Sequence, residues 1–212
     1  MLFKGVPQSV MRNLFSLPAL LLIILVSGCA TTPKEPELSL ELRQTLWETR
    51  YKELQQMNHW QLMGRLGLRV PDQSGSMSVE WLQNQQDFTV YLDGPLGQSL
   101  AKIESNDHGI MVEADGKRYQ GHTPEALLYD LTGWQLPVSY LRFWIQGVPV
   151  PGIQETSMQL DNEGQLSHLK QAGWTIEYLE YQSQPPVSLP GRIRVEKDDI
   201  QMTLVARRWQ VK

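Results

Sequence analysis

Residues 61–70 read QLMGRLGLRV, and apolar or small residues alternate with polar ones through most of this stretch. One side of an extended chain would carry Leu62, Gly64, Leu66, Leu68 and Val70, and the other Gln61, Met63, Arg65, Gly67 and Arg69. Because successive side chains of a strand point to opposite faces, this pattern is typical of a strand with one buried and one solvated face. It predicts an antiparallel sheet, in which one face can stay in water.

The same two-residue period returns along the rest of the chain. Apolar residues alternate at 77–81, 88–92, 101–103 and 110–112, and turn-forming residues lie at 84–87, 93–97, 106–109 and 115–116. Further strands are expected near 157–160, 166–171, 174–181, 192–195, 200–206 and 208–211. Ten or eleven short strands with few helices predict a mainly β fold, arranged as a curved antiparallel sheet or an incomplete, open barrel.

Three segments carry helical signals. Ser39 is a candidate N-cap, and apolar residues follow it at helical spacing: Leu42, Leu46, Trp47, Leu54 and Met57. We expect this helix to pack against the domain; a position on a membrane surface is the alternative, but the mixed charges favour packing. Residues 123–133, which begin with Thr-Pro-Glu and end in glycine, predict a second helix, and residues 137–146 predict a third.

The N-terminal segment has the features of an export signal. Residues 17–29 read LPALLLIILVSGC, an apolar run that ends at the only cysteine of the chain. The run is shorter than the roughly 20 residues that cross a bilayer, so it predicts a secretory signal peptide. The small residues before Cys29 resemble a bacterial lipobox, which implies cleavage after residue 28 and diacylglyceryl and N-acyl groups on Cys29. An ordinary signal peptide with a chance cysteine is the alternative, and translation starts at Met1 or, for a more compact signal, at Met11.

The length and charge of the remainder fit one globular domain. Residues 29–37 contain two prolines and few apolar side chains, so we expect a flexible tether, followed by a single domain at 38–212. Residues 1–28 hold two of the 19 basic residues and none of the 23 acidic ones, so the remainder has a net charge of −6 and nucleic acid is not an expected partner. A single cysteine allows no internal disulfide.

No pattern in the sequence predicts an enzyme. The four histidines are scattered without metal-binding spacing, so we expect neither a metal nor any other cofactor beyond the covalent lipid. Ser99 lies in GQSLA, which lacks the second glycine of a nucleophile elbow, so a periplasm-facing hydrolase is the least favoured alternative. A basic cluster suggests either a solvated strand face or a surface for anionic headgroups or an acidic partner; it comprises Arg192, Arg194, Arg207 and Arg208.

Several longer segments resemble the LolB family of outer-membrane lipoproteins. They are VEWLQ (79–83), FTVYLDGPLGQSLAKIE (88–104), ADGKRY (114–119), LTGWQLPVSYLRFWIQGVP (131–149) and RRWQVK (207–212). The resemblance implies an incomplete antiparallel barrel with helices over its open side and an apolar cavity for acyl chains. It also implies a receptor that accepts lipoproteins from a soluble periplasmic carrier similar to LolA and inserts them into the outer membrane.

The resemblance also implies roles for single residues. Leu96, between Pro95 and Gly97, matches the loop leucine with which the family places cargo in the membrane. The resemblance implies the cavity, and the periodicity of the sequence supplies the candidates for its lining as residues that point inward: Leu66, Leu68, Val79, Trp81, Val90, Leu92, Ile103 and Trp144. In bacterial lipoproteins an aspartate after the lipidated cysteine implies retention in the inner membrane, but Ala30 follows Cys29 here. The expected location is therefore the periplasmic face of the outer membrane of a Gram-negative bacterium, with a lipid anchor. We expect the protein to be a monomer.

A second class of function is open at this point. An envelope-assembly scaffold would have a filled core and a protein-binding face, whereas an acyl carrier would have a hollow core. The many tryptophan, methionine and aliphatic side chains fit either arrangement, because composition does not distinguish a filled core from a hollow one.

Overall fold

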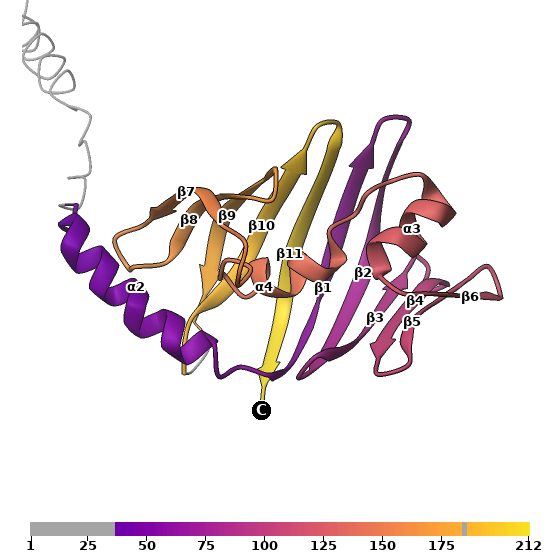
Figure 1. Cartoon of the computed structure of the whole chain (residues 1–212), viewed down its shortest axis with the longest axis horizontal. Coiled ribbons are helices and arrows are strands. Elements are labelled where there is room, and N and C mark those ends of the chain that lie inside the picture. Colours follow the sequence, from indigo (N-terminus) through magenta and orange to yellow (C-terminus); the bar gives the residue numbers. More distant parts are fainter. Residues whose placement is uncertain (1–36, 184–185) are drawn as a thin grey trace, which may run out of the picture. The chain divides into compact units, whose positions relative to one another are not determined.

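Eleven antiparallel strands form one continuous sheet in the computed structural model, which describes residues 37–183 and 186–212 (Figure 1). Their order is β6-β5-β4-β3-β2-β1-β11-β10-β9-β8-β7, so each strand lies beside its neighbours in the chain, and β1 meets β11 in the middle. β6 and β7 form the two edges and do not pair with each other. The predicted mainly β fold, an open antiparallel sheet of about eleven strands, is confirmed.

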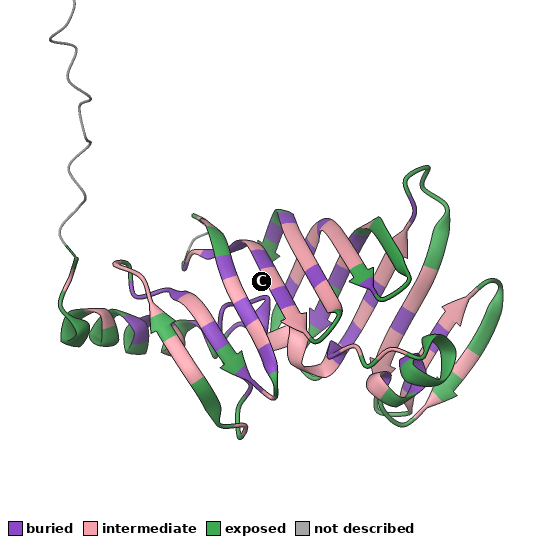
Figure 2. Cartoon of the chain, turned by 90° about the horizontal axis from the view of Figure 1, so that it is seen from above, coloured by how far each residue is buried: buried purple, intermediate pink, exposed green. Residues whose placement is uncertain are grey.

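The longest strands lie at the centre of this sheet. The bounds are β1 His59–Val70, β2 Gln73–Asn84, β3 Asp87–Asp93, β4 Ser99–Asn106, β5 Gly109–Ala114, β6 Lys117–Gly121, β7 Glu155–Leu160, β8 Leu166–Gln171, β9 Trp174–Gln182, β10 Leu189–Lys197 and β11 Ile200–Val211. Bands of buried and more exposed residues alternate along the strands, as the two-residue period predicts (Figure 2).

Strand β1 sets the pattern of the inner face because it pairs on both sides along nearly its whole length. Leu62 lies opposite Trp81 of β2 and Trp209 of β11. Leu66 and Leu68 follow at two-residue intervals and point to the same side. Residues 61–70 therefore lie in the central strand of the sheet and contribute to its apolar inner face.

A bulge in β11 corrects one detail of the sequence prediction. Met63 pairs with Arg208, but Gly64 pairs with Ala206, so Arg207 is an extra residue on β11. The two C-terminal segments predicted as separate strands are therefore one strand, because a bulge shifts the period without ending the pairing. A Cβ atom at Gly64 would overlap a backbone carbonyl oxygen of β11, so only glycine fits opposite the bulge.

Two short helices lie in the segment that joins the two edges of the sheet, and they cover its inner face (Figure 1). α3 (Pro124–Thr132) and α4 (Val138–Trp144) follow β6 and precede β7, so this part of the chain crosses the open side. The Thr123 hydroxyl caps α3 by accepting a hydrogen bond from the Ala126 amide, and Gly133 ends α3 with a φ of 77°. Both ends of α3 match the prediction, whereas α4 is shorter than predicted.

α2 (Leu40–Leu54) packs on the domain mainly through its C-terminal half. Ser39 caps it, as predicted, and Trp47 is buried. Leu42 and Leu46, which the helical pattern placed on the packed face, are instead 44% and 38% exposed. The reason is that the buried face of α2 carries Trp47, Arg50 and Leu54, and at about 100° per residue Leu42 and Leu46 lie to one side of that face.

The N-terminal predictions concern a part of the chain that the structure does not describe. The predicted signal peptide, Cys29 and residues 29–36 of the predicted tether lie outside the described residues. Residues 38–212 form one compact unit. In the described ranges, no helix combines the length and the apolar character needed to cross a membrane.

Candidate functional site

An apolar cavity of about 260 Å³ lies between the inner face of the sheet and the covering helices. The lining residues are Leu62, Leu66, Leu68, Met77, Val79, Trp81, Val90, Leu92, Leu100, Ala101, Ile103, Leu128, Thr132, Trp134, Leu136, Val138, Leu141, Ile145, Ile193, Val195, Met202 and Leu204. Polar atoms in the lining side chains are confined to two indoles and the Thr132 hydroxyl, which donates to the Leu128 carbonyl at 2.7 Å. Such a wall accepts hydrocarbon and gives a charged group no partner.

The structure brings together seven of the eight residues that the sequence suggested for a cavity. These are Leu66, Leu68, Val79, Trp81, Val90, Leu92 and Ile103. They converge because the strand register aligns inward residues across neighbouring strands; Val90, for example, lies between Trp81 and Ile103. That these residues contact a ligand stays a prediction.

Trp144 lies elsewhere, and the structure corrects this assignment. It is fully buried, but its ring packs against Tyr140 and Trp174, with centroids 5.6 Å and 6.4 Å away. Its indole nitrogen donates to the side-chain oxygen of Gln171 at 3.0 Å. On α4 the cavity is lined by Val138 and Leu141, whereas Trp144 anchors the helix to β8 and β9.

Sequence reasoning missed the part of the wall that comes from β10, β11 and the covering segment. Ile193 and Val195 of β10, and Met202 and Leu204 of β11, follow the same two-residue period as the predicted residues. That period was a sufficient signal for these four. Residues such as Leu136 carry no comparable signal, because their position depends on how the covering segment packs.

Packed aromatic rings close one end of the cavity. The ring of Trp81 lies 6.0 Å from that of Trp60 and 5.4 Å from that of Phe88. Trp60 also makes an edge-on contact with Trp209 at 5.4 Å. All four side chains are buried, so they form a continuous floor under the cavity.

The loop between β3 and β4 presents Leu96 to solvent. The Gly94 amide donates to the Gln98 carbonyl at 2.8 Å, and the Gly97 amide donates to the Gly94 carbonyl at 2.9 Å. The Gln98 side-chain oxygen accepts a hydrogen bond from the Leu96 amide at 3.2 Å, and Gly97 has a φ of 79° that favours glycine. The loop, which includes the exposed Pro95, thus closes on itself and leaves Leu96 95% exposed.

The Leu96 loop and the aromatic floor lie at opposite ends of the strands. Asp93, the last residue of β3, pairs with Ser78, which lies toward the β1–β2 turn. Trp60 and Phe88 lie toward the other end, next to the β2–β3 turn. An exposed apolar tip therefore stands at the end of the sheet away from the floor.

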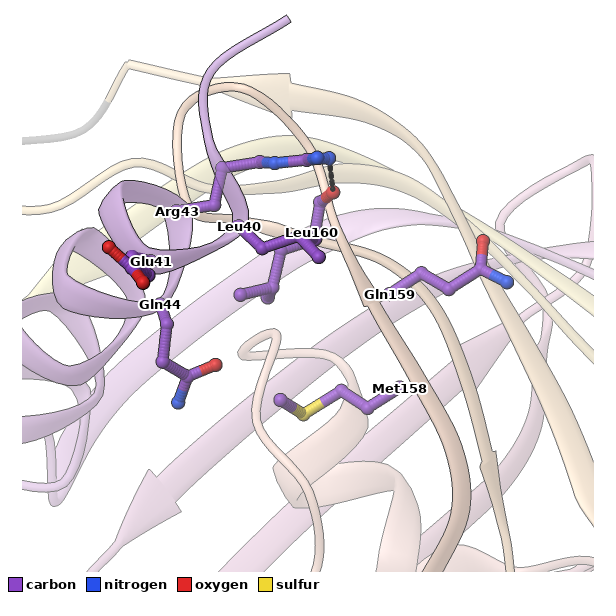
Figure 3. A pocket seen from close by; sticks show the side chains of 7 residues that line it. All are labelled: Leu40, Glu41, Arg43, Gln44, Met158, Gln159 and Leu160. Carbon is purple, nitrogen blue, oxygen red and sulfur yellow. Dashed lines mark hydrogen bonds between the residues drawn. The ribbon is translucent and has the colours of Figure 1, made fainter.

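A second hollow lies between α2 and the edge strand β7 (Figure 3). It measures about 600 Å³, and Glu41, Arg43 and Gln44 contribute to its lining. The Arg43 guanidinium donates to the Leu160 carbonyl at 3.2 Å across it. Because this hollow is open and partly charged, it does not shield hydrocarbon from water.

The four arginines of the predicted basic cluster are at least partly exposed to solvent. Arg192 and Arg194 of β10 each form an ion pair with a glutamate of β9, at 2.8 Å and 3.0 Å. Arg207 and Arg208 are exposed. This arrangement favours the solvated strand face over a dedicated anion-binding cluster.

The structure places Ser99 at the first position of strand β4, where its side chain is exposed. It does not stand at the strand-to-helix turn that a nucleophile elbow needs. In residues 37–183 and 186–212, no group of three or more histidine, cysteine, aspartate or glutamate side chains is placed to hold a metal ion.

A cluster of buried polar side chains joins α2 to β9. The Arg50 guanidinium donates to the Ser188 carbonyl and lies over the Tyr181 ring, 5.2 Å from its centroid. Burial raises the pKa of Tyr181 and of Tyr178 above the usual 10, and burial lowers the pKa of Arg50. None of the three lines the cavity, so this cluster serves the packing of α2.

Comparison with known proteins identifies relatives over nearly all of this domain. Residues 58–209 match the family model described as "Outer membrane lipoprotein LolB". Outer-membrane lipoprotein LolB of Pseudomonas aeruginosa is 37% identical over 189 residues, which cover 89% of this chain and 92% of that protein. The protein of that name from Stutzerimonas stutzeri is 35% identical over 204 residues, covering 96% and 97%.

Similarity to solved structures is more distant. The crystal structure of the LolA superfamily protein NE2245 from Nitrosomonas europaea has a TM-score of 0.48 and 10% identity, covering 80% of this chain and 93% of that one. That likeness is too remote to support a functional argument. The match over residues 58–209 and the identity to relatives of nearly the same length are decisive: the chain belongs to the family of the outer membrane lipoprotein LolB.

Proposed function

We propose that this protein receives lipoproteins at the periplasmic face of the outer membrane, shelters their acyl chains and delivers them into that membrane. The observation that carries the proposal is the hydrocarbon-lined cavity of about 260 Å³ between the sheet and its covering helices. Membership of a family whose members are named outer-membrane lipoproteins supports the location.

Transfer between apolar sites explains the chemistry of the wall. Each methylene exposed to water costs about 0.8 kcal/mol, so an acyl chain moves favourably only from one apolar site to another. The partner that delivers cargo is then a soluble periplasmic carrier similar to LolA, with a cavity of its own. No nucleotide is needed if each acceptor binds more tightly than the donor, because about 1.4 kcal/mol gives a tenfold bias.

Leu96 is the proposed point of contact with the membrane. It stands almost fully exposed on a loop that its own hydrogen bonds hold in shape, with Pro95 and Gly97 on either side. Burial of one leucine contributes roughly 1.5–3 kcal/mol, which suffices for a transient membrane contact. The contact would bring the cargo-loaded domain to the lipid surface, where the acyl chains leave.

Cys29 is the proposed lipidation site, and its covalent lipid is the only cofactor in the proposal. The sequence around Cys29 and the lipoprotein names of the relatives support this assignment. Several acyl chains together give a lasting anchor, whereas one gives only reversible binding. Residues 29–37 would then tether a monomeric domain to the membrane.

Two alternatives receive less support from the site. A scaffold lipoprotein would need a filled core, and the cavity favours a carrier. A hydrolase would need an activated nucleophile, and Ser99 is exposed at the start of a strand. We therefore propose a receptor and carrier rather than an enzyme.

Binding of a fluorescent fatty acid tests the proposal. Two adjacent residues of β3 offer a matched pair, because Leu92 lines the cavity whereas Tyr91 lies on the opposite face beside Lys102. We expect the wild type to bind the probe and to release it when a lipoprotein is added. Leu92→Gln should weaken binding about tenfold by burying an unpaired amide, and Tyr91→Gln should not. No binding by the wild type, or equal losses in both variants, would refute the acyl-binding cavity.

A further inference from the structure

Cross-strand pairing arranges the inner face of the sheet in rows of side chains. Leu62, Trp81, Val90 and Ile103 form one row, and all four line the cavity. On β1 the lining residues run from Leu62 to Leu68, a span of about 20 Å along the strand. The cavity is therefore extended along the strands, and each of its ends can be assigned to particular residues.

The row beyond Leu62 contributes no lining residue. It consists of Trp60, Gln83 and Phe88, which pair across β1, β2 and β3 and are all buried. Trp81 stands between this row and the cavity and is 5% exposed. It is the largest of the four side chains that an apolar ligand meets at this end, and its ring packs on those of Trp60 and Phe88 behind it.

A buried amide fixes the Trp81 ring. The indole nitrogen of Trp81 donates to the Gln83 side-chain oxygen at 3.0 Å. The Gln83 side-chain nitrogen donates in turn to the carbonyls of Gln85 and Asp87 in the β2–β3 turn, at 3.0 Å and 3.1 Å. Because a buried donor is costly to leave unpaired, the ring stays in place when a ligand arrives. Flexible side chains such as Met77, by contrast, lie nearer the other end.

We propose that Trp81 determines specificity by chain length: its indole is the stop for the terminal methyl group and sets the longest saturated acyl chain that the cavity buries. This inference rests on the proposed acyl-binding function. Affinity rises about fourfold with each added methylene while there is room to bury it. A methylene that the floor excludes adds nothing, so the rise in affinity stops at one chain length.

Substitutions can move the stop in both directions. Trp81→Ala removes the ring and deepens the cavity toward the row of Trp60 and Phe88. Ala101→Phe raises the floor, because Ala101 lines the cavity and pairs with Leu92, one row nearer the other end. Neighbouring rows are roughly 7 Å apart along the strand, so the shifts should be measurable.

A matched control separates cavity depth from general loss of packing. Trp47 is a buried tryptophan of nearly the same exposure, 6%, but it lies on α2 and does not line the cavity. Trp47→Ala therefore removes an equivalent ring without changing the floor. Circular dichroism of each variant verifies that it is folded.

The test measures displacement of a bound fluorescent fatty acid from the mature protein by saturated fatty acids of increasing length. In the wild type, log affinity should rise with chain length and then level off. Trp81→Ala should move the break to chains longer by about two carbons or more, Ala101→Phe should move it to shorter chains, and Trp47→Ala should leave it unchanged.

The possible results distinguish the two proposals. An unmoved break in folded Trp81→Ala, or an equal change in affinity at every length, overturns the role of Trp81. If Trp81→Ala does not fold, the test rests on Ala101→Phe. If the chain length at which affinity levels off is then the same in Ala101→Phe as in the wild type, the aromatic floor is not what limits chain length. A wild type that binds chains without any break refutes this inference only, whereas a wild type that binds none refutes the acyl-binding function itself.

Discussion

The indole nitrogen of Trp144 lies 3.0 Å from the side-chain oxygen of Gln171, and this hydrogen bond joins α4 to β8 inside the domain. The same oxygen accepts a bond from the Val150 amide at 2.8 Å. The side-chain nitrogen of Gln171 donates to the carbonyls of Val150 and Ile153, at 3.0 Å and 2.7 Å. One fully buried glutamine therefore holds both α4 and the segment that leads to β7.

Gln171→Leu should destabilise the domain strongly. The substitution keeps the volume nearly constant but removes all four of these bonds, and it leaves the Trp144 indole, the Val150 amide and the Ile153 carbonyl without those partners in the interior. We expect the free energy of unfolding to fall by at least about 3 kcal/mol, as measured by urea denaturation. Gln165→Leu is the control, because Gln165 is also buried but, among the described residues, its side-chain amide forms a single hydrogen bond, to Glu163 at 2.9 Å. Equal losses in the two variants would contradict the role given to Gln171.

The two stacked tyrosines of β9 should respond differently to loss of their hydroxyls. Tyr181 donates to the Leu166 carbonyl at 2.9 Å, whereas the Tyr178 hydroxyl has no hydrogen-bond partner among the described residues. Tyr181→Phe should cost about 1 kcal/mol of unfolding free energy. Tyr178→Phe should be neutral or stabilising, because it removes a buried hydroxyl that is not paired. A larger loss for Tyr178→Phe than for Tyr181→Phe in urea denaturation would show the assignment to be wrong.

The same tyrosines predict alkaline destabilisation. Burial raises the pKa of both above the usual 10, so the unfolded state loses these protons first as the pH rises. The free energy of unfolding should therefore fall from about pH 10 upward, by up to about 1.4 kcal/mol per pH unit for each tyrosine. Denaturation curves between neutral pH and pH 11 measure this slope. The slope should be smaller in Tyr178→Phe, and an unchanged slope would contradict the prediction.

Leu96→Glu should separate cargo binding from membrane insertion. The loop closes through backbone bonds and Gln98, so the charge at its tip leaves the fold and the cavity intact. We expect unchanged affinity for a fluorescent fatty acid but at least about tenfold slower incorporation of an acylated lipoprotein into liposomes. Leu179→Glu, on another exposed leucine, is the control and should insert cargo normally. Normal incorporation by Leu96→Glu would exclude the loop as the insertion element.

Cys29→Ala, exported with an ordinary cleavable signal, should still accept cargo. The cavity lies wholly within residues 62–204, so loss of the anchor leaves the binding site unchanged. Affinity for the fluorescent probe should stay within about twofold of the lipidated form. Complete loss of cargo binding would mean that anchor and cavity do not act separately.

The inner wall of the sheet was largely predictable from sequence because a strand has a fixed period of two. Leu66, Val79 and Leu92 needed only that period and correctly placed turns. Trp144 shows where this reasoning ends: it lies on a helix of two turns, and which face meets the cavity depends on the Gln171 anchor far along the chain.

The predicted burial of Leu42 and Leu46 on α2 was wrong for a related reason. Its helical spacing was right, but the buried face includes Arg50, which a pattern of apolar residues does not count, so Leu42 and Leu46 lie beside that face rather than on it. The bulge at Arg207 escaped prediction because a period shifted by one residue reads as the end of one strand and the start of another.

The crossing segment between β6 and β7 has a consequence for how such a protein can diversify. It contributes Leu128, Leu136 and Leu141 to the compartment but no strand to the sheet. Residues inserted or deleted there would resize the compartment while leaving every cross-strand hydrogen bond in place. The volume of the cavity can thus change without a change in the sheet, and related proteins could accept larger or smaller cargo through changes in this one segment.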